Sequence, residues 1–160
     1  MATDDRALRD QLVELLRGSN AHADVKTVFA DFPADLAGKK PQGAPHTAWQ
    51  LLEHLRIALH DILDFTTNSE YLEMKFPDDY WPESDAPPSA DTWKQSVAAI
   101  EADLQDFEDL VNDPASNLYA QIPWGSGQTL LREVLLAADH NSYHLGQLVY
   151  LRKQLGAWKG

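Results

Sequence analysis

Apolar residues recur along the chain with the 3.6-residue period of amphipathic helices. The pattern predicts four helices, over residues 5–30, 47–66, 91–112 and 129–154. Gly18 can split the first of them into two, because glycine is a poor helix former. The second helix has a clear start signal, since Thr47 and Gln50 have the spacing of a capping box.

The remaining segments carry turn residues and no strand pattern of useful length. Residues 70–90 contain four prolines and several aromatic side chains without a helical period. We expect an ordered loop packed over one end of the helices, in which Tyr80 and Trp81 line a pocket. Residues 112–128 predict a second irregular or extended connection. Four amphipathic helices in a chain of 160 residues predict an all-α four-helix bundle that forms one domain over residues 1–160.

The composition is that of a globular protein, with 44% hydrophobic and 24% charged residues. The net charge of −12 argues against a nucleic-acid partner and against attachment to an anionic membrane. Without cysteine the chain has no disulfide and no thiolate ligand of its own. The N-terminus lacks the features of a signal peptide, and no apolar run approaches the ~20 residues of a membrane span, so a cytoplasmic protein is the expectation.

Three of the six histidines lie in positions that favour a metal site. His140 and His144 are four residues apart on the last helix, so both rings leave the same face and can bind one divalent cation. His54 lies between Leu51 and Leu55 on the side of its helix that should pack. A buried imidazole needs a partner. The partner is either an ordinary hydrogen bond in the core or a metal shared with the pair across the bundle.

Four further side chains are candidates to assist such a site. Asp61 follows His54 by seven residues and Glu133 precedes His140 by seven, so each lies on the same helix face as its histidine. Each is either a functional carboxylate, as a base or a partner of the ligands, or an ordinary surface residue. Asp139 and Gln147 flank the histidine pair and are candidates to orient an imidazole.

The other histidines are not expected at the site. His60 is six residues from His54 and should point elsewhere, His46 precedes its helix, and His22 should be solvated. Trp49 and Trp93 are expected in the core, and Trp124, in the connection before the last helix, is a candidate wall of the site.

Two segments resemble the DinB-like superfamily, which includes the YfiT-type metal-dependent hydrolases. They are TAWQLLEHLRIAL and, more specifically, LREVLLAADHNSYHLGQLVYLRK. The resemblance covers essentially the whole chain. It implies a four-helix bundle in which His54, His140 and His144 hold zinc, nickel or a similar divalent ion. Relatives of this kind are often dimers, so a homodimer is also an expectation.

Three protein ligands leave one coordination position open, as in catalytic rather than structural metal sites. Water bound there is acidified and can act as a nucleophile. The resemblance also implies thiol chemistry, since some relatives are S-transferases or isomerases that use low-molecular-weight thiols. We therefore expect an enzyme of hydrolase or thiol-transferase type that acts on a small-molecule substrate or thiol. Two alternatives stay open: a non-catalytic metal-binding protein induced by stress or damage, and a helical dimer in which the three histidines are only structural.

Overall fold

The computed structural model describes residues 3–18 and 20–159, and in this part of the chain the regular structure is helical. The elements are α1 (Thr3–Arg17), α2 (Val25–Phe29), η1 (Ala34–Leu36), α3 (Ala48–Thr67), η2 (Asp78–Tyr80), α4 (Ala90–Asn112) and α5 (Leu130–Gln154). Within the described residues the only β-type pairing is a single bridge between Gln121 and Thr129, just before α5. The prediction of an all-α helical bundle is confirmed.

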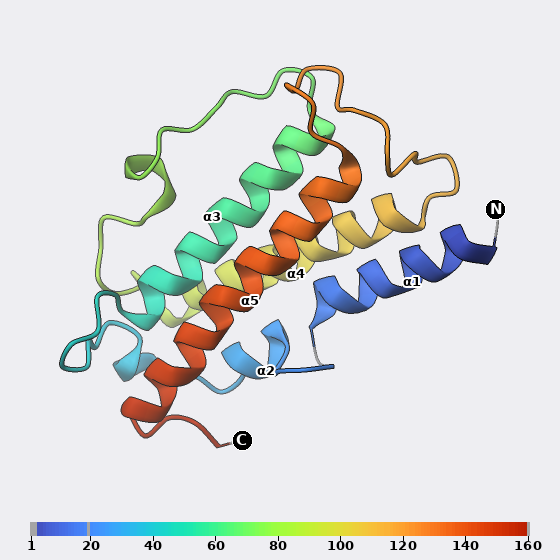
Figure 1. Ribbon diagram of the computed structural model, residues 1–160. Coiled ribbons are helices and arrows are strands. Elements are labelled where there is room, and N and C mark those ends of the chain that lie inside the picture. The colour runs from blue at the N-terminus through green and yellow to red at the C-terminus, as the bar shows by residue number, and fades with distance from the viewer. Residues whose placement is uncertain (1–2, 19, 160) are drawn as a thin grey trace.

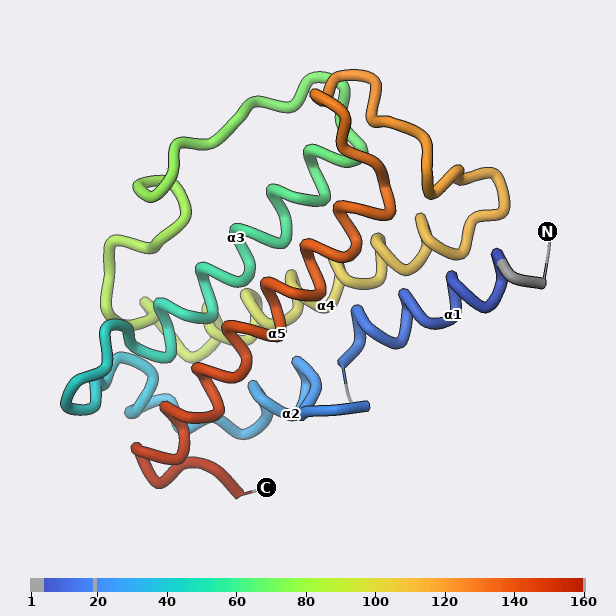
Figure 2. The backbone as a smooth tube through the Cα atoms, in the orientation of Figure 1, coloured from blue at the N-terminus to red at the C-terminus, as the bar shows by residue number. Residues whose placement is uncertain are grey.

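The four long helices form a bundle in which α3 and α5 lie side by side and run in opposite directions (Figure 1). α4 packs against α3, and α1 packs against α4 and α5. α3 and α4 run in the same direction, so the chain has to return along the bundle between them (Figure 2). Residues 68–89, here called the return segment, form this connection from the end of α3 to the start of α4. The segment therefore runs along the length of α3, whereas the sequence led us to expect a loop over one end.

The first predicted helix is two helices in the structure. α1 ends at Arg17, and Gly18, which follows it, has a positive φ of 73°. α2 begins at Val25 and is capped by Asp24, whose side chain accepts a hydrogen bond from the N–H of Thr27. Glycine reaches this left-handed conformation without strain, which makes Gly18 a natural helix terminus. The other three predicted helices agree with the structure to within one residue at each end.

Hydroxyl side chains begin the three longest helices. Thr47, Ser89 and Thr129 each accept a hydrogen bond from a backbone N–H of the first turn. At α3 the predicted capping box is present, because Gln50 Oε1 also accepts from the N–H of Thr47. Thr47 is fully buried, and its hydroxyl donates to the carbonyl of Asp85 at 2.7 Å. The end of the return segment is thereby tied to the start of α3.

Two buried arginines, Arg9 and Arg152, donate hydrogen bonds to backbone carbonyls at or near the ends of helices. Arg9 donates to the carbonyls of Val111, Asp113 and Ser116, and so satisfies the last turn of α4. Arg152 donates to the carbonyls of Val28 in α2, of Ala30 just after it, and of Ala157. Among the residues described, none of the helices combines the length and the hydropathy that crossing a bilayer requires.

Candidate metal centre

Three imidazoles from two neighbouring helices converge between α3 and α5. His54 comes from the first half of α3, while His140 and His144 lie one turn apart on α5. The Nε2 atom of His54 lies 3.1 Å from Nε2 of His144 and 3.1 Å from Nε2 of His140. One nitrogen from each ring falls within 4.8 Å of the others. The predicted convergence of the three histidines is confirmed.

The outer nitrogens of two rings face hydrogen-bond acceptors. His54 Nδ1 lies 2.9 Å from the carbonyl oxygen of Tyr80 in the return segment. His144 Nδ1 lies 2.9 Å from Oε1 of Gln147, one turn further along α5. Because a backbone carbonyl can only accept, His54 Nδ1 carries the proton of its neutral ring, and the Nε2 lone pair of His54 faces the other two rings.

Neutral imidazoles this close together either hydrogen-bond through an Nε2–H or share a cation. An additional proton on the cluster is disfavoured, because burial lowers the pKa of His140 and His144 to about 4 and lowers that of His54 as well. The neighbouring imidazoles lower the pKa of each ring further. The three rings are thus neutral at neutral pH, which is the form of imidazole that binds a metal ion.

The donor set fits a divalent transition-metal ion. An ion with tetrahedral bonds of 2.0–2.1 Å to nitrogen holds its ligands roughly 3.3 Å apart, close to the two separations of 3.1 Å. Neutral imidazoles suit zinc, nickel, copper and iron and give no preference for one of them. His140 differs from the other two, since its buried Nδ1 has no hydrogen-bond partner among the described residues.

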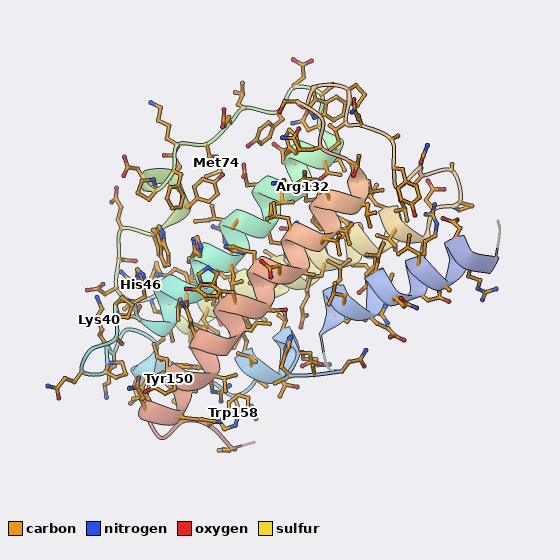
Figure 3. The ribbon with its side chains drawn as sticks, viewed as in Figure 1. Lys40, His46, Met74, Arg132, Tyr150 and Trp158 are labelled. Carbon is orange, nitrogen blue, oxygen red and sulfur yellow. The ribbon has the colours of Figure 1, made fainter. Side chains whose placement is uncertain are left out.

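An aromatic stack covers the outer side of the centre. The ring of Trp81 lies parallel to that of His54, with 4.0 Å between their centroids and 3° between their planes. His46 stacks on the opposite face of Trp81, also at 4.0 Å. Figure 3 shows His46 beside the start of α3. The sequence indicated Trp81 as a pocket residue but gave no role to His46, because stacking across two loops leaves no periodic signal.

Asp61 holds the return segment near the centre. Its carboxylate accepts hydrogen bonds from the hydroxyls of Tyr80, at 2.6 Å, and of Tyr71, at 2.9 Å. Burial and the carboxylate acceptor raise the pKa of Tyr71 to about 12 and raise that of Tyr80 as well, so both hydroxyls keep their protons. Asp61 thus lines the cavity beside the histidines, and among the described residues its partners are the two tyrosines rather than an imidazole.

A cavity of about 520 Å³ opens beside the three imidazoles. It lies between α3, α5 and the return segment, and Tyr80 and Trp81 contribute to its wall, as the sequence predicted. A second cavity, of about 650 Å³, adjoins it and shares Asp61 and Tyr80 with it. Trp124 lines this second cavity and donates to the carbonyl of Phe65 at 2.7 Å, so it does not wall the histidine cluster itself.

The other candidate residues lie away from the histidines. Glu133 is buried and paired with Arg132 at 2.8 Å, at the start of α5 and beside the second cavity. Arg132 is labelled there in Figure 3. Asp139 is exposed and makes no hydrogen bond to an imidazole in the described part of the chain, so of the two predicted orienting residues only Gln147 contacts one.

The remaining histidines and tryptophans lie as predicted. His60 is exposed and faces Asp103 of α4 at 3.3 Å, and His22 is exposed near Ser142. Trp49 and Trp93 are buried in the core.

Comparison with known families supports the same fold. The model of the DinB superfamily matches residues 7–148, which include α3, the return segment and the histidine pair of α5. Comparison with curated proteins and with solved structures gives no significant match. The match extends over most of the chain, and the chain belongs to the DinB superfamily.

Proposed function

We propose that this protein binds one divalent metal ion through His54, His140 and His144 and uses it to activate water or a small thiol. The observation that carries the proposal is the convergence of three neutral imidazoles, with Nε2 of His54 3.1 Å from the Nε2 atoms of both His140 and His144. A divalent cation among the rings would engage all three nitrogens at once, at separations close to those of tetrahedral coordination. Zinc and nickel are the ions we consider first, as imidazole suits both.

The protein groups around the site have separate tasks in this proposal. His54, His140 and His144 would hold the ion with one coordination position open, and a divalent ion bound there would supply Lewis-acid chemistry that lowers the pKa of a bound water or thiol. The Tyr80 carbonyl and Gln147 orient two of the rings through their Nδ1 protons. Trp81 covers His54 and limits its access to bulk water. Asp61 is the only carboxylate among the described residues that line the cavity, and we assign it as the acceptor of a proton from the ligand.

Metal titration of purified variants tests the binding step. The wild-type protein should bind one zinc or nickel ion, and the His144→Ala variant should bind it at least ~100-fold more weakly, because one of three bonds is lost. His60→Ala is the matched control, as His60 is a histidine of α3 outside the cluster. Equal affinity of His144→Ala and the wild type would refute the ligand set.

A second measurement separates the two reactions from the non-catalytic alternative. The cobalt-loaded protein is titrated with 2-mercaptoethanol and, separately, assayed with an activated ester. A sulfur-to-cobalt charge-transfer band supports thiol activation, and ester hydrolysis that is lost in Asp61→Asn supports water activation. A protein that binds cobalt but shows neither response is a metal-binding protein without this chemistry.

A further inference from the structure

The cavity beside the three imidazoles is walled mainly by apolar groups. Ala58 and Ile62 of α3, Leu136 of α5 and the ring of Trp81 are among the residues that line it. Besides the histidines, its lining includes the carboxylate of Asp61 and the hydroxyls of Tyr80 and Tyr143, and the first two of these groups are already bonded to each other at 2.6 Å. A polar ligand would therefore leave most of its own hydrogen-bonding groups without partners there.

Two large aromatic side chains at this cavity remain open to solvent. Phe76 of the return segment is 77% exposed and Tyr143 of α5 is 64% exposed, and both belong to the cavity wall. The Phe76 ring lies 5.8 Å from that of Tyr80, and the Tyr143 ring meets His144 edge-on at 4.9 Å. Exposed apolar surface from two separate elements around one cavity is typical of a ligand-binding site.

The size of the cavity and the charge around it further limit the class of ligand. The volume of about 520 Å³ lies in the range of pockets that hold small molecules. The one carboxylate in the lining and the net charge of −12 disfavour a ligand that carries a further anionic group beyond the atoms that would bind the metal.

We propose that the ligand of this centre carries an apolar, preferably aromatic, group that fills the cavity between Phe76 and Tyr143 while its metal-binding atom faces the three histidines. The proposal rests on the proposed metal function and defines its substrate class. Aromatic rings favour this place, because Tyr143 and Phe76 offer ring contacts in addition to apolar area.

Two hydroxamates with the same metal-binding head test the proposal on the cobalt-loaded protein. Acetohydroxamic acid carries a methyl group, and benzohydroxamic acid carries a phenyl ring. Binding is followed by the visible absorption of cobalt and by calorimetry. The phenyl compound should bind at least ~10-fold more tightly, because its ring is removed from water in the cavity.

Substitution of Tyr143 and Phe76 tests whether these side chains cause the preference for the phenyl compound. In Tyr143→Ala and in Phe76→Ala the ratio of the two dissociation constants should fall at least ~3-fold toward one, since part of the ring contact is lost. Tyr119→Ala is the matched control, because Tyr119 is also 64% exposed but lies outside the cavity wall. It should keep the wild-type ratio.

The outcomes distinguish the two proposals. Equal affinity for both hydroxamates, or an unchanged ratio in the Tyr143 and Phe76 variants, overturns the apolar ligand class and leaves the metal function standing. If the protein retains cobalt but binds neither hydroxamate, the bound metal has no accessible coordination position. This result overturns both the proposed activation of water or thiol and the present inference. Failure to bind cobalt overturns the metal site itself.

Discussion

Each imidazole of the centre has a different contact at the nitrogen that faces away from the other rings. His54 meets a backbone carbonyl, His144 meets a side-chain amide, and His140 meets no hydrogen-bond partner among the described residues. The contact of a ligand's second nitrogen fixes the tautomer and raises the basicity of the first. The three histidines should therefore contribute unequally to metal affinity.

The amide of Gln147 is the contact most easily removed. Replacing Gln147 by Leu deletes the acceptor at His144 Nδ1 and keeps the helix and most of the side-chain volume. We expect zinc affinity to fall about 10-fold, the lower end of the effect of losing such a partner. Competition with a chromogenic chelator measures this change. Gln154→Leu, on the same helix, is the control, and a loss of equal size in both variants would contradict a specific role for Gln147.

Acid should destabilise the metal-free protein through the same rings. Burial lowers the pKa of His140 and His144 to about 4, against about 6.5 in an unfolded chain. Between these values the unfolded state binds more protons, so stability is complete above pH 6.5 and decreases as the pH falls toward 4. Between pH 7 and pH 5 the free energy of unfolding should decrease in both proteins. We expect the decrease to be about 1 kcal/mol smaller in His140→Phe than in the wild type.

Urea unfolding in the presence of a chelator tests this expectation. His22→Phe, which changes an exposed histidine, should follow the wild type over the same pH range. Parallel pH profiles for the wild type and His140→Phe would show that His140 titrates normally in the folded protein.

At the residue scale, the sequence was informative where the contacts follow helix geometry. The spacing of His140 and His144, the contact of Gln147 with His144 and the burial of His54 all follow from positions within one helix. The Tyr80 carbonyl is different. It reaches His54 from an irregular segment 26 residues away, and no periodicity predicts where such a backbone group lies.

Among the elements, the return segment decides how the centre is enclosed. It supplies the carbonyl of Tyr80 and the ring of Trp81, and Asp61 binds it through two tyrosine hydroxyls. Its far end is fixed to α3 by Thr47, whose hydroxyl donates to the Asp85 carbonyl. The segment is thus an ordered wall of the site rather than a linker.

Removing one hydroxyl tests this role of the segment. Tyr80→Phe keeps the backbone carbonyl and the ring but loses the bond to Asp61. We expect a loss of about 1 kcal/mol in stability and a few-fold weaker zinc binding, because the Tyr80 carbonyl that accepts from His54 is then held in place less firmly. Hydrogen exchange of residues 78–82 should become faster. Tyr71→Phe is the control, because it also removes one hydroxyl that donates to Asp61. Equal zinc affinity of Tyr80→Phe and the wild type would contradict a role of the Tyr80–Asp61 hydrogen bond in metal binding.

The helices themselves could be predicted, but their directions could not. Apolar periodicity and the capping box of Thr47 and Gln50 located α3, and similar patterns located α4 and α5. That α3 and α4 are parallel depends on packing among all four helices, which no single segment encodes. The long connection at residues 70–90 was the only sign of it in the sequence.

For the whole molecule, the core is built without the metal site. A single apolar cluster joins α1, α2, α3, α4 and α5, and Arg9 and Arg152 satisfy carbonyls at loop ends. We therefore expect the chelator-treated protein to keep its helical circular dichroism and to melt cooperatively.

Zinc should then add stability only through binding. At a free concentration of 100 times the dissociation constant it contributes about 3 kcal/mol, or roughly 5–10 °C in Tm for a chain of this size. His144→Ala should show little of this shift. Unfolding of the wild type on chelation alone would mean that the metal is structural, which would remove the main support for an open catalytic site.

X-ray absorption spectroscopy of the zinc-loaded protein shows whether His54, His140 and His144 together bind one metal ion. We expect one zinc per chain with three imidazole nitrogens at about 2.0–2.1 Å and one further light atom. In His144→Ala the imidazole scattering should fall by one ring. A zinc ion surrounded only by carboxylate and water oxygens, or an unchanged spectrum in His144→Ala, would contradict this ligand set.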